Sequence, residues 1–292
     1  MQDDTALPFD RALLDARRRR WLTGKLTPPS FLLDAVAAEL TERLSLVQRR
    51  FERGVDLGGY GGALARRLEA GGQVATLVRV ERDAAFLSGG PGLAVVGDEE
   101  ALPLGDDSVD LIASALALHL TNDTPGTFLQ IRRALRPDGL FLAAILGGDS
   151  LTELRTSLLA AEAETTGGAA PRVAPFIELR AAGALLQRSG FALPVIDQDR
   201  LTVRYDTMFQ LMADLRAMGM ANMLNARSRR PLTRTVFLRA AEIYAERFAD
   251  PDGRVRATFD IVYLSGWKPH ESQQKPLRPG SAKVSLADVL KP

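Results

Sequence analysis

Residues 53–62 read RGVDLGGYGG, an apolar segment followed by a glycine-rich one, and this stretch decides the fold that we expect. It predicts a short strand that runs into a tight loop, because glycine lets the backbone turn sharply and approach a ligand without a Cβ in the way. The next residues, ALARRLEAGG, predict a helix. Strand, glycine loop and helix in this order are typical of a nucleotide-binding cradle, although a tight turn without a ligand explains this stretch equally well.

Apolar strands and helices alternate on both sides of this loop. After it, four apolar runs read QVATLVRV, LAVVG, VDLIASALAL and LFLAAIL, with helices expected from Asp83 and across LQIRRALRPDG. Strands that are apolar on both faces specify an α/β fold, in which helices cover a parallel sheet. Before the loop, apolar residues at spacings of three and four predict one helix: Leu33, Val36, Leu40, Leu44, Val47 and Phe51.

The second half of the chain has a looser pattern. A helix is expected from Ser150, where Ser150 and Glu153 have the spacing of a capping box, and a strand is expected at LTVRY. Two helices, MFQLMADLRAMGM and TVFLRAAEIYAERF, precede a late strand, ATFDIVYLSGWK. We therefore predict three parts: a helical cap over residues 1–52, a core domain over residues 53–268 with a helical insertion at about 206–249, and a tail over residues 269–292.

The composition excludes several classes of protein. With 37 basic and 36 acidic residues the net charge is +1, which argues against a general nucleic-acid binder. The chain has no cysteine, so disulfides and thiolate metal sites are excluded, and only His119 and His270 supply imidazoles. No run of about 18 apolar residues predicts a membrane span, and no apolar secretion signal begins the chain. A cytoplasmic bacterial protein, at most peripheral to the inner membrane through a partner, is the expectation.

Several motifs together resemble a known family. The segments GDEEALPL, ALHLTNDTP, LRPDG, LGGDSLTELR and GWKPHES resemble those of class I S-adenosylmethionine-dependent methyltransferases, and the last two resemble the branch of complex I assembly factors that hydroxylate an arginine. The resemblance implies a Rossmann-like fold with a seven-stranded, mostly parallel sheet in the order 3-2-1-4-5-7-6, and an antiparallel last strand. It also implies S-adenosylmethionine as cofactor and a subunit of respiratory complex I as protein partner.

The same resemblance assigns a cofactor pocket. Glu81, after the second strand, is expected to accept two hydrogen bonds from the ribose hydroxyls, because an ionised carboxylate is only an acceptor. Structural roles, such as a solvated or turn-capping carboxylate, are the alternatives for each position taken alone. The residues expected to contact the cofactor are Asp56, Gly58, Gly62, Glu81, Asp98, Glu99 and Ser114.

Two positions depart from the family pattern. Tyr60 stands where the glycine motif usually has glycine, so its side chain is expected to crowd the backbone approach. A different alignment puts Arg79 in place of Glu81 as the ribose-binding position, and an arginine there accepts no hydrogen bond. Both departures predict weak binding of S-adenosylmethionine.

The catalytic candidates are His119, Asp149 and Glu153, with Asn122 and Asp123 nearby. The alternatives are that His119 is a packed histidine, that Asp149 is a carboxylate at a helix N-terminus, and that Glu153 is a capping-box partner. If the substrate is an arginine, its guanidinium favours paired carboxylates, which Asp149 and Glu153 would supply. An iron site would need His119, His270 and a carboxylate such as Glu271, and we do not include a metal in the prediction.

Three functions remain open at this point: an enzyme that modifies an arginine of a complex I subunit, a methyltransferase of a small molecule or carrier-bound acyl group, and a non-catalytic assembly chaperone. For the first, the inserted helices and the tail are expected to form a lid over the open end of the sheet. Arg227, Arg229, Arg230 and Trp267 would then hold a substrate segment beside the cofactor. Solvated arginines and a packed tryptophan are the alternative.

Overall fold

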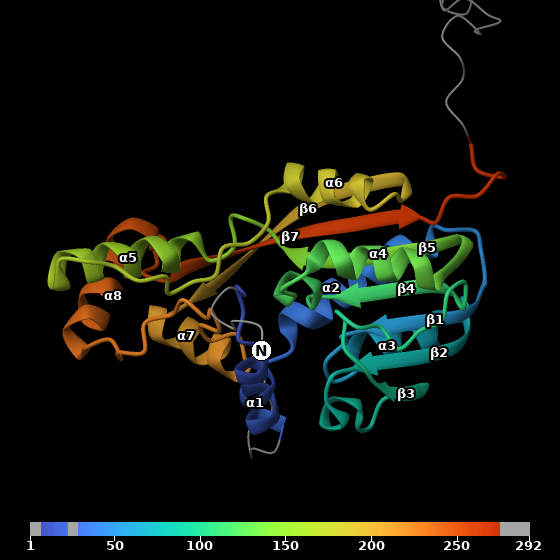
Figure 1. Ribbon diagram of the computed structural model, residues 1–292. Coiled ribbons are helices and arrows are strands. Elements are labelled where there is room, and N and C mark those ends of the chain that lie inside the picture. The colour runs from blue at the N-terminus through green and yellow to red at the C-terminus, as the bar shows by residue number, and fades with distance from the viewer. Residues whose placement is uncertain (1–6, 23–28, 275–292) are drawn as a thin grey trace, which may run out of the picture.

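The computed structural model describes residues 7–22 and 29–274, and it contains one seven-stranded sheet in the order β3-β2-β1-β4-β5-β7-β6 (Figure 1). The first five strands are parallel, and β7 is antiparallel to both of its neighbours. The predicted fold class and strand order are confirmed. The strands are β1 (Phe51–Leu57), β2 (Val74–Glu81), β3 (Leu93–Val96), β4 (Val109–Ala115), β5 (Leu135–Leu146), β6 (Ala192–Tyr205) and β7 (Val255–Trp267).

Two hydrophobic clusters lie on opposite faces of the sheet, because side chains alternate along a strand. In β4, Leu111 and Ala113 belong to the first cluster and Ile112 to the second. Helices α2 (Phe31–Ser45) and α3 (Ala63–Gly71) cover the first face. Helices α4 (Thr124–Ala134) and α6 (Leu179–Arg188) cover the second.

A group of three helices lies beside the main sheet rather than on its centre. Strands β6 and β7 extend past the other strands, and α5 (Thr152–Thr166), α7 (Met208–Ala217) and α8 (Arg234–Phe248) gather around this extension (Figure 1). Helix α1 (Arg11–Leu22) lies between these helices and the carboxyl ends of the parallel strands. The two helices before β7 are present as expected, while the division into cap, core and tail stays a prediction.

Some predicted boundaries are wrong for identifiable reasons. Phe51 begins β1 instead of ending a helix, since α2 ends at Ser45. The segment LRPDG belongs to the start of β5, not to the end of a helix. The helix expected from Asp83 is one 3-10 turn, η2 (Ala84–Leu87). The capping box does not form: Ser150 donates its hydroxyl to the Asp260 carbonyl oxygen, and Glu153 accepts hydrogen bonds from Thr258.

The segment GWKPHES lies at the edge of the sheet opposite the glycine loop. Trp267 pairs with Leu140, and the Lys268 amide donates to the Gly139 carbonyl oxygen at 2.8 Å. The prediction that Trp267 holds a substrate segment beside the cofactor is therefore wrong, because β7 runs antiparallel and Trp267 ends it at the edge away from the glycine loop. The tail from residue 275 onwards, including GSAKVSL, lies outside the described residues. Within residues 7–22 and 29–274, no helix is long and apolar enough to cross a membrane.

Candidate functional site

The glycine loop follows β1 at the carboxyl edge of the sheet. Gly58 has a φ of 70°, and its amide donates to the Val80 carbonyl oxygen at 2.9 Å. A Cβ at Gly58 would lie 2.5 Å from the Ala117 Cβ and 3.1 Å from Glu99 Oε1, so only glycine fits there. Gly62, with a φ of 74°, precedes α3. The loop thus keeps its backbone close to the neighbouring strands, as a ligand cradle requires.

Asp56 is buried beneath this loop. Its Oδ2 accepts a hydrogen bond from the Ala65 amide at 3.1 Å, whereas its Oδ1 has no partner among the described residues. Burial raises the pKa of this carboxyl to about 7, against the opposing effects of the Ala65 amide and Arg79. An unpaired buried carboxylate oxygen is costly, and Asp56 is not among the residues that line the cavities described below.

Glu81 and Tyr60 are joined at the tip of the loop. The Tyr60 amide donates to Glu81 Oε1 at 2.5 Å, and burial raises the pKa of Glu81 to about 8 although Arg18 opposes the shift. Tyr60 has a φ of 23°, and its ring packs edge-on against Phe86 at 5.1 Å between centroids. The Arg18 guanidinium carbon lies 4.9 Å from the centroid of this ring. The Tyr60 ring is therefore held by contacts with Phe86 and Arg18.

Arg79 has a structural role in this fold. It is buried, and its guanidinium donates to the Leu87 carbonyl oxygen at 2.8 Å and to the Gly90 carbonyl oxygen at 3.1 Å. These bonds hold the loop between η2 and β3. Glu81, in contrast, is the last residue of β2 and reaches the glycine loop. Of the two candidate ribose-binding positions, the geometry thus favours Glu81 over Arg79.

Helix α1 covers the acidic loop after β3. Arg11 forms ion pairs with Asp98 at 2.8 Å, with Glu100 at 2.6 Å and with Glu99. Burial raises the pKa of Glu99, while the pKa of Asp98 is lowered because the Glu100 amide and Arg11 outweigh its burial. We call Asp56, Glu81, Asp98 and Glu99 the acidic half of the site, and α1 closes it.

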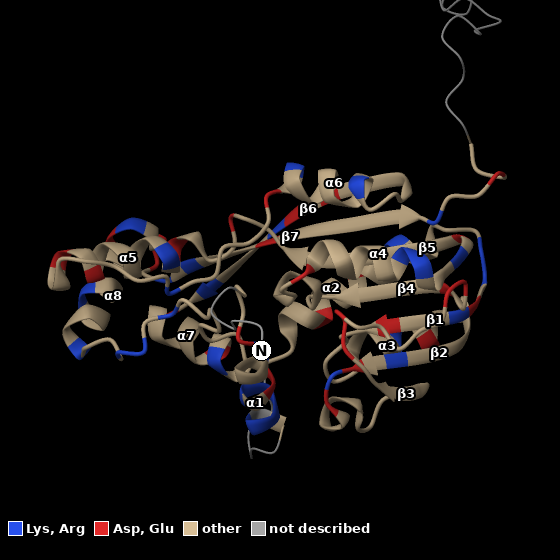
Figure 2. Ribbon diagram, in the orientation of Figure 1, with Lys and Arg blue, Asp and Glu red and all other residues tan. Residues whose placement is uncertain are grey.

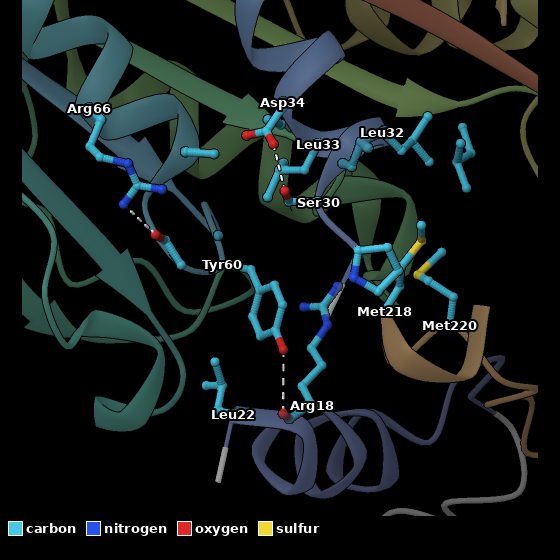
Figure 3. A pocket seen from close by; sticks show the side chains of 17 residues that line it. Arg18, Leu22, Ser30, Leu32, Leu33, Asp34, Tyr60, Arg66, Met218 and Met220 are labelled. Carbon is cyan, nitrogen blue, oxygen red and sulfur yellow. Dashed lines mark hydrogen bonds between the residues drawn. The ribbon is translucent and has the colours of Figure 1, made fainter. Parts of the chain in front are cut away.

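A cavity of about 300 Å³ forms the other half of the site, which we call the apolar half (Figure 3). Ala115 and Leu116 at the end of β4 line it, whereas Ser114 is buried and donates its hydroxyl to the Leu57 carbonyl oxygen at 2.7 Å. Asp34 is the only carboxylate among its described lining residues, and it accepts a hydrogen bond from the Ser30 hydroxyl at 2.6 Å. The other lining residues are Arg18, Leu22, Pro29, Ser30, Leu32, Leu33, Gly58, Tyr60, Gly61, Ala63, Arg66, Leu146, Met218 and Met220.

His119 lies in η3 (Leu118–Leu120) and lines a separate cavity of about 270 Å³. Neither ring nitrogen has a hydrogen-bond partner in the described part of the chain, and the ring packs edge-on against Phe176 at 5.7 Å between centroids. Burial lowers the pKa of His119 to about 3, so the imidazole is neutral near pH 7. These contacts match the packing alternative.

The structure does not bring Asp149 and Glu153 together as a carboxylate pair. Asp149 is exposed and forms an ion pair with Arg200. Glu153 is buried and accepts hydrogen bonds from the Thr258 amide at 3.1 Å and the Thr258 hydroxyl at 2.5 Å. Neither residue lines the apolar half. Their catalytic role stays a prediction that the geometry does not support.

The remaining candidates have local structural contacts. Asp123 caps α4 by accepting a hydrogen bond from the Gly126 amide at 2.9 Å, and Asn122 bonds the backbone of Phe9. His270 follows β7 at the opposite edge of the sheet from His119, so the two imidazoles cannot share an iron ion. The described residues contain no group of three histidine, aspartate or glutamate side chains that could hold a metal.

Sequence reasoning missed Arg11, Arg18 and Asp34. The sequence pattern alone assigns no site role to the basic run RRRR at residues 17–20, yet Arg18 within it is only 8% exposed. The signal was the spacing: Arg11, Leu14 and Arg18 recur at three and four residues and so share one side of α1. Asp34 lies on α2 within an otherwise apolar segment, which is the only sign that it faces a cavity.

Comparisons with known proteins agree with this arrangement. Residues 55–143 match the methyltransferase domain family. The chain is 38% identical over 290 residues to the Danio rerio protein named "Arginine-hydroxylase NDUFAF5, mitochondrial", and the match covers 97% of this chain and 89% of that protein. The chain belongs to the NDUFAF5 arginine-hydroxylase family. Its predicted relationship to the class I methyltransferases and to this branch is confirmed.

Two other similarities are informative. The malonyl-[acyl-carrier protein] O-methyltransferase of Laribacter hongkongensis is 33% identical across 84% of this chain and 85% of its own length. The solved structure of the YcgJ protein from Bacillus subtilis has a TM-score of 0.55 at 15% identity and covers 80% of this chain and 99% of its own, which bears on the fold alone.

The predicted cytoplasmic bacterial location is contradicted. The family members that match 97% of the chain are named as mitochondrial proteins. The prediction rested on an apolar secretion signal not being recognised in the sequence, and this criterion does not distinguish a bacterial cytoplasm from a mitochondrial location.

Proposed function

We propose that this protein binds S-adenosylmethionine, hydroxylates an arginine side chain of a respiratory complex I subunit and thereby assists the assembly of that complex. The observation that carries the proposal is the 38% identity, over 97% of the chain, to a protein named as an arginine-hydroxylase. The predicted resemblance to complex I assembly factors supplies the partner.

The residues present suit the cofactor. Gly58 lines the cavity, and Asp56 Oδ1, which has no partner within the described chain, would accept a hydrogen bond from an ammonium group. Ala115 and Leu116 would contact the methionine chain, and Glu81 would accept hydrogen bonds from the ribose hydroxyls. When bound, the cofactor supplies a sulfonium with a transferable methyl group. Its adenine would take the place of Arg11 beside Asp98 and Glu99, so α1 must shift.

Asp34 is the residue of the apolar half that suits an arginine substrate. A guanidinium is always charged and pairs well with a carboxylate in a largely apolar surrounding. Asp34 already accepts a hydrogen bond from Ser30, which orients its carboxylate while leaving acceptor sites free. We assign the binding of the substrate guanidinium to Asp34.

Hydroxylation converts one C–H bond of the arginine into C–OH. With dioxygen as oxygen donor, the second oxygen atom leaves as water, and two electrons and two protons are consumed. The oxidant and the reductant are therefore co-substrates of the proposed reaction. The part that we assign to this chain is to bind and orient the arginine and to exclude bulk water from it.

The test is mass spectrometry of complex I subunits from cells that contain the wild-type protein, no protein, or Asp34→Asn. In the deletion strain and in the Asp34→Asn strain, we expect a single arginine of one subunit to be lighter by one oxygen atom than in the wild type. The variant must accumulate and melt like the wild type for the comparison to hold. Subunits with unchanged masses in the deletion strain would refute the proposal.

The similarity to malonyl-[acyl-carrier protein] O-methyltransferase favours one alternative, methyl transfer to a carrier-bound acyl group. This alternative predicts formation of S-adenosylhomocysteine that depends on malonyl-acyl carrier protein. A non-catalytic chaperone predicts instead that Asp56→Asn and Glu81→Gln leave complex I assembly normal. Hydroxylation predicts that neither result is observed.

A further inference from the structure

A larger cavity, of about 480 Å³, lies among the three helices beside the sheet. Its apolar lining comes from separate elements: Leu154 and Leu158 on α5, Leu215 on α7 and Phe237 on α8. Together with Phe176 these side chains present a broad apolar surface to a ligand. Among the candidate site residues of the sequence analysis, Arg227, Arg229 and Arg230 line this cavity.

The charge around this cavity is one-sided. No aspartate or glutamate occurs among its described lining residues, whereas six arginines do, in a chain whose net charge is only +1. Figure 2 shows basic segments in blue on α7 and on the chain that leads into α8. Such a local excess of one sign attracts a ligand of the opposite sign. The six are Arg17, Arg172, Arg216, Arg227, Arg229 and Arg230.

Half of these arginines already have partners. Arg17 donates to the carbonyl oxygens of residues 221 and 222, Arg172 pairs with Glu162 at 2.5 Å, and Arg227 pairs with Asp10 at 2.8 Å. Within the described residues, the side chains of the other three, Arg216, Arg229 and Arg230, form no hydrogen bond or ion pair. They remain able to pair with an external anion.

The cavity adjoins the apolar half of the site. Met220 lines both spaces, so the two cavities are neighbours. A protein segment that occupies the larger cavity and delivers one side chain to Asp34 would pass Met220. The residues flanking the delivered side chain then meet the apolar lining and the arginines of the larger cavity.

We infer that the larger cavity binds an acidic, apolar segment of the protein substrate, adjacent in sequence to the arginine that is modified. This inference rests on the proposed function and adds the chemistry of the segment to it. The target arginine itself does not fit this cavity, because the guanidinium groups of Arg216, Arg229 and Arg230 repel another one. Apolar side chains bind the lining, and two or more carboxylates pair with Arg216, Arg229 and Arg230.

The binding test uses a fluorescein-labelled peptide that has two leucines, one phenylalanine and three glutamates on the amino-terminal side of a single arginine. Fluorescence anisotropy with the wild-type protein should show saturable binding that weakens as salt rises. A matched peptide with glutamine in place of glutamate should bind about tenfold more weakly, since three partly exposed ion pairs are lost.

The variant test removes the three unpaired charges. Arg216→Gln/Arg229→Gln/Arg230→Gln should lower the affinity for the glutamate peptide about tenfold and leave that for the glutamine peptide unchanged. The control is Arg180→Gln/Arg188→Gln/Arg247→Gln, which removes the same charge at exposed positions outside the cavity and should bind like the wild type. Equal binding of the glutamate peptide to both triple variants would overturn the inference.

A further probe separates a protein segment from a lipid-like ligand. Dodecyl phosphate carries an apolar chain and an anionic group but no peptide backbone. Saturable binding of dodecyl phosphate without binding of either peptide would overturn the inference. These binding assays need no turnover, so they are independent of the mass-spectrometric test of arginine modification. Glutamate-dependent binding together with unchanged subunit masses in the deletion strain would refute the proposed function and support the binding of an acidic segment.

Discussion

The two halves of the candidate site share one loop but differ in access. The acidic half contains Glu81 and Glu99, both less than 10% exposed and both facing arginines of α1. The apolar half is an open cavity that includes Gly58 and Leu116. The strands position both halves, whereas α1 closes only one. The difference shows that access to this cradle is determined outside the glycine motif.

The closed half, and the helix α1 that closes it, keep buried polar groups without full pairing. Asp56 Oδ1 and Arg18 Nε have no hydrogen-bond partners within the described chain, and leaving such atoms unpaired costs about 1–3 kcal/mol each. A ligand that supplies donors to Asp56 and moves α1 recovers part of this cost. The closed arrangement is thus suited to exchange its internal contacts for those of a cofactor.

The largest expected effect follows from Glu81→Gln. Above pH 8, where the Glu81 carboxyl is ionised, the substitution removes a charged acceptor for the ribose hydroxyls while keeping the shape of the side chain, and such hydrogen bonds contribute about 1.5–3 kcal/mol. We expect affinity for S-adenosylmethionine to fall at least about tenfold by calorimetric titration. Glu153→Gln, at a buried carboxyl outside both halves, is the control. Unchanged affinity in Glu81→Gln would mean that the acidic half does not bind the ribose.

The second prediction concerns pH. Burial raises the pKa of Glu81 from 4.5 to about 8, so the folded protein holds a proton that the unfolded chain releases between these values. The contribution of this group to the free energy of unfolding is complete below pH 4.5. It falls by about 1.4 kcal/mol per pH unit as the pH rises from 4.5 through 8. Asp56, with a pKa of about 7, acts in the same direction.

We therefore expect the wild-type melting temperature, measured without ligand, to fall by several degrees between pH 6 and pH 8.5. Glu81→Gln should show a clearly smaller fall, because its amide does not titrate. Equal slopes for the two proteins would show that the acidic half is hydrated rather than closed.

A smaller effect is expected for Arg11→Gln. The substitution removes three ion pairs between α1 and the acidic loop, while Arg82 still lies 3.4 Å from Glu99. Amide hydrogen exchange in α1 should become faster. Cofactor affinity should rise about threefold to tenfold, because the form in which α1 closes the acidic half competes with cofactor binding and is populated less. Arg20→Gln, at an exposed position of α1, is the comparison variant. Slower exchange or weaker cofactor binding in Arg11→Gln would argue against closure by α1.

The smallest effect is expected for Tyr60→Phe. The Tyr60 hydroxyl makes one long hydrogen bond, 3.4 Å, to the Arg18 carbonyl oxygen, whereas the ring contacts with Phe86 and Arg18 are kept in phenylalanine. The melting temperature should change by less than about 2 °C and cofactor affinity by less than twofold. A large loss would identify the hydroxyl, rather than the ring, as the part of Tyr60 that holds α1.

The sequence predicted the strands and the cradle well because these depend on local patterns. The apolar run into Asp56 and the glycines around Tyr60 are sufficient to identify a strand and a tight loop. The closure was not predictable in this way, since Arg11 and Glu99 are 88 positions apart. Glu153 illustrates the same limit: its spacing from Ser150 indicated a local cap, but tertiary contacts with Thr258 on β7 replaced it.

Helix α1 is attached on two sides, to the acidic loop through Arg11 and to the segment after α7 through Arg17 and the Asp10–Arg227 pair. Binding events on the two sides are therefore thermodynamically linked. If a segment in the larger cavity changes cofactor affinity by some factor, the cofactor must change the affinity for that segment by the same factor. The sign of this coupling decides the order of events: a positive coupling favours a ternary complex, and a negative one favours release of the substrate once the cofactor is in place.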